Sequence, residues 1–220
     1  MTMRIPFKTI VVALLLSALP EIGQSADHPI RILALGDSLT EGYGLPPGSD
    51  FPNVLEHALR AKGLNVSVIN AGVSGDTSAG GRARLDWSLG DEKSAPDAAI
   101  VELGANDGLR GLPVAEMQKN LDDILARFKA RHIPVLLAGM MAPRNYGEIY
   151  AKTFDVVFPQ LAKKYGVLFY PFFLDGVVLN TNLLQADALH PNAKGLDVIV
   201  KNIAPMVVRL IDEAKEKHAS

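Results

Sequence analysis

Short hydrophobic runs recur along the chain and predict the strands of a sheet. They cover residues 30–35, 66–70, 98–103, 133–138 and 167–170. Apolar runs of this length are typical of strands that are buried on both faces. The longer segments between them carry hydrophobic residues at a helical period. The chain is therefore expected to alternate between strands and helices.

Hydrophobic residues in the intervening segments recur three and four positions apart. This spacing is seen in 51–61, with Val54, Leu55, Ala58 and Leu59, and in 114–131, with Met117, Leu121, Ile124, Leu125 and Phe128. Helices are also expected at 150–165 and from 192 to about 216, where Pro159 and Pro205 should kink or divide them. Strands that alternate with helices predict an α/β fold whose parallel sheet is covered on both faces.

The first residues have the pattern of a secretory signal. Arg4 and Lys8 precede an uncharged apolar run, 10–19, and the segment ends on the small residues Ser25 and Ala26. A permanent membrane anchor is the weaker interpretation, because a spanning helix needs about 20 apolar residues. We therefore expect a signal peptide over 1–26, cleaved after residue 25 or 26, a single domain over 27–220, and a periplasmic or secreted protein.

Cysteine and charge content narrow the class of protein further. The chain has no cysteine, so it can form no disulfide and carries no lipobox cysteine for a lipid anchor. Its 22 basic and 24 acidic residues are interleaved and give a net charge of −2. A nucleic-acid partner would require a basic surplus or stripe, so none is expected. No stable membrane anchor is expected after cleavage of the leader.

A serine follows the first predicted strand directly. Ser38 lies where the run 30–35 ends and a glycine-rich turn begins. A hydroxyl at the carboxyl end of a strand projects toward the crevice in which open α/β sheets bind ligands. Ser38 is therefore a candidate nucleophile. The alternative is that Ser38 and Thr40 simply cap the next helix.

A nucleophilic serine needs a base, and the sequence offers one far downstream. Asp187 precedes His190 by three positions, a spacing that puts both side chains on one side of a helical turn. The carboxylate would take the proton on one imidazole nitrogen and leave the other free as a base. The alternative is an ordinary acid and histidine on a solvated loop.

Two further turns follow predicted strands and offer hydrogen-bond donors for an oxyanion. Gly75 would let its backbone N–H approach a substrate, and the Asn106 amide would provide a second donor. Both residues are also common turn formers. Asp37, Asp76 and Asp107 lie among these turns, but no H-E-x-x-H motif or dense histidine and carboxylate cluster accompanies them. Neither a metal nor a cofactor is therefore expected.

Together these turns resemble the four sequence blocks of the SGNH, or GDSL, hydrolase superfamily. The blocks are GDSLT at 36–40, SGDT at 74–77, GAND at 104–107 and DALHP at 187–191. The similarity extends from about residue 32 to about 205 and is closest to the bacterial branch of thioesterases, lysophospholipases and arylesterases. One departure is Ala105, where that branch has a second glycine. Alanine should fit there unless the position requires a positive φ.

The resemblance implies a fold and a set of roles. The fold would be a flavodoxin-like three-layer α/β/α sandwich with a five-stranded parallel sheet. Ser38 would be the nucleophile, His190 the base and Asp187 its orienting acid. The oxyanion hole would combine the Ser38 and Gly75 N–H groups with the Asn106 side chain.

The expected reaction is hydrolysis of small-molecule carboxylic esters and thioesters through an acyl-enzyme. The substrate range would include aryl esters, short-to-medium acyl esters, acyl thioesters and lysophospholipids. Gly108, Leu109, Tyr146 and Phe172 are candidate substrate-binding residues. The alternatives are a carbohydrate O-acetyl esterase of the same superfamily and a non-catalytic periplasmic module that binds an anion at the Ser38 turn.

Overall fold

The computed structural model describes residues 28–91 and 94–218 and contains a five-stranded sheet. The strands are β1 (Ile30–Gly36), β2 (Val66–Gly72), β3 (Ala98–Glu102), β4 (Val135–Ala138) and β5 (Leu168–Tyr170). All neighbours pair in parallel, in the order β2-β1-β3-β4-β5. The predicted α/β fold with a five-stranded parallel sheet is confirmed.

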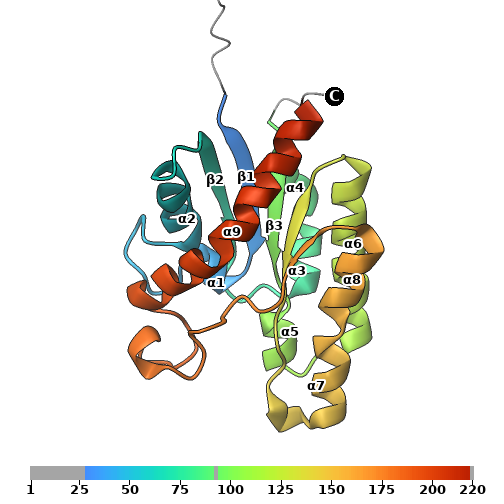
Figure 1. Cartoon of the computed structure of the whole chain (residues 1–220). Coiled ribbons are helices and arrows are strands. Elements are labelled where there is room, and N and C mark those ends of the chain that lie inside the picture. The colour runs from blue at the N-terminus through green and yellow to red at the C-terminus, as the bar shows by residue number, and fades with distance from the viewer. Residues whose placement is uncertain (1–27, 92–93, 219–220) are drawn as a thin grey trace, which may run out of the picture.

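Helices cover both faces of the sheet (Figure 1). One layer contains α2 (Phe51–Arg60) and α9 (Ala193–His218), which pack against each other. The other contains α3 (Ser78–Ala83), α4 (Leu85–Leu89), α6 (Val114–Ala130), α7 (Glu148–Asp155) and α8 (Val157–Tyr165). The shorter elements are α1 (Ser38–Glu41), α5 (Ala105–Leu109), η1 (Arg144–Tyr146) and η2 (Thr181–Leu183).

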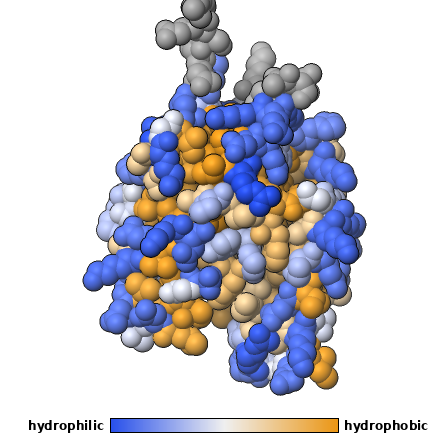
Figure 2. Space-filling view, in the orientation of Figure 1, coloured by the Kyte–Doolittle hydropathy of each residue, from blue (hydrophilic) through white to orange (hydrophobic). Residues whose placement is uncertain are grey.

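The hydrophobic core lies between these layers and the sheet. Every residue of β3 and β4 is buried, as expected for central strands with helices on both sides. Phe51 of α2 and Phe173, which follows β5, are fully buried and meet edge to face at 5.0 Å. Figure 2 shows mainly hydrophilic side chains on the outer surfaces of the helices, with hydrophobic ones between them.

The register of the central strands brings their carboxyl ends together. Gly36, the last residue of β1, pairs with Gly72 at the end of β2 and with Glu102 at the end of β3. The three loops that follow these strands therefore begin side by side. Because β1 has β2 on one side and β3 on the other, this edge is the switch point of the sheet, where α/β folds bind ligands.

Two prolines have different effects on the predicted helices. The segment predicted as one helix over 150–165 is divided at Val156 into α7 and α8, and Pro159 lies in the first turn of α8. A first-turn N–H has no intrahelical partner, so proline costs nothing there. By contrast, α9 continues through Pro205.

The predicted signal peptide, 1–26, lies outside the described residues. Within the described ranges, no helix is long and apolar enough to cross a membrane.

Candidate active site

The turn after β1 presents Ser38 as the first residue of α1. The helix is capped by the preceding residue, since the Asp37 carboxylate accepts a hydrogen bond from the Leu39 N–H at 3.0 Å. Thr40 is buried and donates its hydroxyl to Glu102 Oε2 at 2.7 Å. Neither Ser38 nor Thr40 is therefore the cap of α1, and the Ser38 hydroxyl is left for other partners.

His190 joins this hydroxyl to Asp187. The distance from His190 Nε2 to Ser38 Oγ is 3.0 Å, and His190 Nδ1 lies 2.6 Å from Asp187 Oδ2. The two segments are 152 positions apart in the chain. The structure thus brings together the three predicted residues in the order of a nucleophile, a base and an orienting acid.

The local conformation of the acid and the base differs from the expected helical turn. Asp187 and His190 lie on an irregular turn in which Ala188 has a φ of +57°. Asp187 Oδ1 accepts the backbone N–H groups of Leu189 and His190, both at 3.0 Å. The helical interpretation of the three-residue spacing was therefore wrong, although its consequence, that the two side chains meet, was right.

The same hydrogen bonds determine the charge of the acid. The backbone N–H of Leu189, followed by the side chain and backbone of His190, lowers the pKa of Asp187 to about 2. Hydrogen bonds to the ionised form have this effect on a carboxyl group. Asp187 is thus negative at neutral pH and can hold the imidazole with Nδ1 protonated, which leaves Nε2 as the acceptor toward Ser38.

The loops after β2 and β3 contribute two of the three predicted oxyanion donors, Gly75 and Asn106. Gly75 has a φ of +83°, which a side chain would make costly. Among the described residues, no protein acceptor receives its backbone N–H. The Asn106 amide nitrogen donates to Asp37 Oδ2 at 3.1 Å and to the Asp76 carbonyl at 3.0 Å. Both of its hydrogens are in use, so an oxyanion would compete with one of these acceptors.

A pair of buried carboxyl groups, Asp37 and Glu102, lies next to the Ser38 turn. Burial raises the pKa of Asp37 to about 6, and hydrogen bonds from Leu39 and Asn106 oppose the shift. Burial, together with the nearby charge of Asp37, also holds the pKa of Glu102 well above its usual range. Glu102 Oε2 accepts hydrogen bonds from Thr40 and the Asp37 N–H, whereas Oε1 is buried without a partner among the described residues.

The four candidate substrate-binding residues lie in different environments. Gly108 is buried, and a Cβ there would approach the Phe154 ring to 3.3 Å. Leu109 and Tyr146 are both exposed. They are in contact, since the Tyr146 hydroxyl donates a hydrogen bond to the Leu109 carbonyl at 2.9 Å. Phe172 is partly buried and packs against the hydrophobic core. The C-terminal end of α5 is thus attached to η1 through Tyr146.

The sequence did not indicate two residues, Tyr43 and Gln185, that lie close to His190. The exposed Tyr43 ring lies 4.6 Å from the His190 ring, centroid to centroid. Gln185 Nε2 donates to the carbonyls of Tyr43 and Pro191, at 2.7 and 3.0 Å, and so connects the two loops. No motif in the sequence indicates these contacts. Among the described residues, no group of three or more histidine and acidic side chains could hold a metal.

Comparison with known proteins agrees with this arrangement. The sequence profile of the GDSL-like Lipase/Acylhydrolase family matches residues 34–198. The chain is 37% identical over 179 residues to an arylesterase of Vibrio mimicus, covering 81% of this chain and 88% of that protein. It is 38% identical over 180 residues to thioesterase 1/protease 1/lysophospholipase L1 of Escherichia coli K12, covering 80% and 84%.

Solved structures give the same result. The SGNH-hydrolase family esterase AlinE4 is 47% identical, with a TM-score of 0.71, and the match covers 83% of this chain and 96% of that one. The psychrotrophic esterase EstA from Pseudoalteromonas sp., whose structure was solved inhibited by monoethylphosphonate, is 34% identical with a TM-score of 0.78, covering 83% and 99%. The chain therefore belongs to the GDSL-like lipase/acylhydrolase family of carboxylic ester hydrolases.

Proposed function

We propose that this protein is an exported serine esterase that hydrolyses small carboxylic esters and thioesters through an acyl-enzyme on Ser38. The observation that carries the proposal is the continuous hydrogen-bonded chain from Ser38 Oγ through His190 to Asp187, with distances of 3.0 and 2.6 Å. A serine hydroxyl is a weak nucleophile unless an adjacent base removes its proton as it attacks. This geometry supplies the base and orients it.

In the first step, Ser38 Oγ forms a bond to the substrate carbonyl carbon while its proton passes to His190 Nε2. The tetrahedral oxyanion would be stabilised by the N–H groups of Ser38 and Gly75 and by the Asn106 amide. Collapse breaks the bond to the leaving group, which takes the proton from His190. A water molecule then repeats the sequence on the acyl-enzyme, with His190 as base, and releases the carboxylic acid.

Related structures support the roles of the serine and the acid. Two further structures of AlinE4 carry alanine in place of one serine and of one aspartate. Those two residues are separated by the same number of positions as Ser38 and Asp187. The EstA structure inhibited by monoethylphosphonate further suggests a phosphonate as a probe for this chain.

The range of substrates and the location of the protein are part of the proposal. The relatives named arylesterase and thioesterase 1/protease 1/lysophospholipase L1 favour aryl esters, acyl thioesters and lysophospholipids. The leader over 1–26 favours export to the periplasm or beyond, with 27–220 as the hydrolase domain. A mature amino-terminus at residue 26 or 27 in protein recovered from the periplasm would support export.

Intact-mass analysis after treatment with a fluorophosphonate tests the nucleophile. We expect one adduct on the wild type, none on Ser38→Ala, and loss of p-nitrophenyl butyrate turnover in parallel. Ser74→Ala is the matched control, because Ser74 lies on the neighbouring loop and its hydroxyl contacts Glu41. This control should keep both the adduct and the turnover. Folded wild type without adduct or turnover would instead favour a binding module.

Acyl chain length separates the esterase from a carbohydrate O-acetyl esterase. The proposed function predicts turnover of both acetyl and octanoyl p-nitrophenyl esters. A sharp loss beyond acetyl, together with cleavage of acetylated sugars, would contradict the lipolytic assignment.

A further inference from the structure

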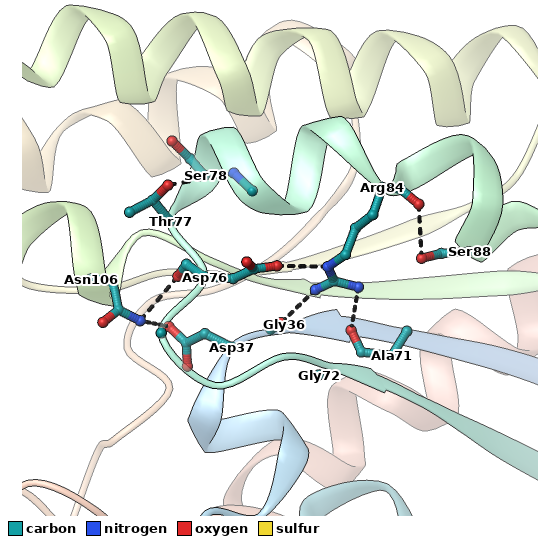
Figure 3. A network of polar contacts seen from close by, with 12 residues as sticks. Gly36, Asp37, Ala71, Gly72, Asp76, Thr77, Ser78, Arg84, Ser88 and Asn106 are labelled. Carbon is teal, nitrogen blue, oxygen red and sulfur yellow. Dashed lines mark hydrogen bonds and ion pairs between the residues drawn. The ribbon is translucent and has the colours of Figure 1, made fainter.

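Arg84 connects three chain segments at the switch point of the sheet (Figure 3). It lies between α3 and α4, and each guanidinium nitrogen donates to a different residue. Nε donates to Asp76 Oδ2 at 2.6 Å, Nη1 to the Ala71 carbonyl at 2.8 Å, and Nη2 to the Gly36 carbonyl at 2.7 Å. The planar guanidinium carries donors on three separate nitrogens and so reaches these three acceptors at once. The donors of a lysine ammonium all lie on one nitrogen, which cannot reach the three acceptors in the same way.

These acceptors belong to the loops that carry the candidate catalytic groups. Gly36 is the last residue of β1 and lies two positions before Ser38. Ala71 belongs to β2, and Asp76 directly follows Gly75. The Asp76 carbonyl in turn accepts one hydrogen of Asn106 (Figure 3). Arg84 is therefore bonded to the ends of β1 and β2 and to Asp76, which follows Gly75 and accepts a hydrogen bond from Asn106.

Other contacts also join these loops, since the Val73 N–H donates to the Gly36 carbonyl at 3.2 Å and the Ser74 hydroxyl contacts Glu41. The Asn106 amide also joins the first loop to the second, through Asp37 and Asp76. In the proposed function, however, the oxyanion competes for that amide. Arg84 does not face such competition, because its donors are directed to Gly36, Ala71 and Asp76 and it has no role as an oxyanion donor.

The surroundings of Arg84 are built for this contact. The side chains of Arg84 and Asp76 are only 18% and 19% exposed, so their ion pair is shielded from water. Gly80 makes room for the carboxylate, since a Cβ there would lie 2.4 Å from Asp76 Oδ1. A charge-assisted hydrogen bond in such a shielded site is stronger than one in an exposed ion pair, so this pair restrains the positions of both side chains.

We propose that Arg84 is a positioning residue of the hydrolytic reaction, which sets the distance between the Ser38 turn and the Gly75 loop while the oxyanion engages Asn106. This inference rests on the proposed function of the site. Arg84 touches no reacting atom and acts through the Gly36 carbonyl and the Asp76 side chain. We therefore expect Arg84 to stabilise the transition state, in which the nucleophile and the oxyanion donors must be in place together, more than the bound substrate.

Arg84→Lys tests the proposal because it keeps the positive charge beside Asp76 and removes the fork. A displacement of about 1 Å in a catalytic group can cost about 100-fold in rate, so we expect kcat for p-nitrophenyl butyrate to fall about 100-fold. KM should change by less than about threefold, because the lost interaction acts in the transition state. Arg127→Lys is the matched control: Arg127 also pairs with acids, Asp86 and Asp123, but lies on α6 away from the site. It should keep the wild-type kcat.

A second variant guards against a folding defect. Asp76→Asn keeps the shape of the side chain and weakens its bond to Arg84, so it should lower kcat in the same direction with a native circular dichroism spectrum. Folded Arg84→Lys and Asp76→Asn proteins with wild-type kcat would overturn the proposal, as would losses of kcat that only follow the unfolded fraction. Failure of the proposed function is distinct, since the wild type itself would then lack turnover and the Ser38 adduct.

Discussion

Replacement of Glu102 by glutamine should stabilise the protein increasingly as the pH rises. Glu102 is fully buried, and Oε1 has no hydrogen-bond partner among the described residues. Glutamine has nearly the same shape, and its carbonyl oxygen can accept the same bonds from Thr40 and the Asp37 N–H as Oε2. The substitution therefore removes an ionisable group with little change in packing.

The sign follows from the raised pKa of this carboxyl. In the unfolded chain the group ionises near 4.5, whereas in the folded protein it keeps its proton to higher pH. The unfolded state then binds fewer protons, so the free energy of unfolding falls as the pH rises above 4.5 and levels off only when the folded carboxyl ionises. One proton limits the slope to about 1.4 kcal/mol per pH unit. From pH 5 to pH 7 the advantage of the variant can thus grow by up to about 3 kcal/mol.

Urea unfolding of both proteins at pH 5, 6, 7 and 8 measures this difference directly. Comparison of variant with wild type cancels most contributions from groups that do not interact with Glu102. Asp37 is the exception, because its charge contributes to the raised pKa of Glu102. Glu116→Gln is the control, because Glu116 is exposed in the first turn of α6. The pH-dependent gain of Glu102→Gln should exceed any that this exposed variant shows. A constant difference for Glu102→Gln, or a wild type that gains on the variant at higher pH, would refute the reasoning.

Three further substitutions test other parts of the structure. Asp187→Asn should lower kcat by about 10³- to 10⁴-fold in steady-state assays, because an amide toward Nδ1 favours the wrong imidazole tautomer; an unchanged kcat would remove Asp187 from the mechanism. Gly75→Ala forces a side chain onto a φ of +83° and should cost about 1–2 kcal/mol in urea unfolding as well as slowing turnover. Phe173→Ala should cost about 3–5 kcal/mol, because this ring is fully buried against Phe51, and should leave kcat of the folded protein unchanged.

Much of the fold could be predicted from local pattern. Each predicted strand overlaps an observed one, because a strand buried on both faces must be hydrophobic throughout. The convergence of Ser38, Gly75 and Asn106 could also be predicted, since parallel strands place their carboxyl ends at one edge. Ala105 was the one doubtful position. The positive φ falls instead on Gly104, at +114°, and alanine is accommodated within α5.

The features that could not be predicted depend on contacts between distant segments. The turn at 187–190 has the i, i+3 spacing of a helix, and only hydrogen bonds to Asp187 Oδ1 distinguish it. In the sequence, Glu102 is simply a polar residue at the end of a hydrophobic strand. Its buried hydrogen bond from the Thr40 hydroxyl comes from a residue 62 positions away and could not be predicted. Tyr43 belongs to no recognisable motif, and its ring contacts His190 where Gln185 joins the two loops.

The two halves of the proposed catalytic machinery differ in how far they are formed before substrate binds. Ser38, His190 and Asp187 already have hydrogen-bond distances that allow proton transfer. The oxyanion donors are less complete, because Asn106 spends one hydrogen on the Asp37 carboxylate. That hydrogen bond lowers the pKa of the buried Asp37 and so favours its ionised form, whereas burial raises the pKa. When an oxyanion takes this Asn106 hydrogen, the Asp37 carboxylate loses a hydrogen bond that stabilises its charge. The cost of that loss opposes binding of the oxyanion, so we expect Asp37 to govern how readily the oxyanion hole is completed.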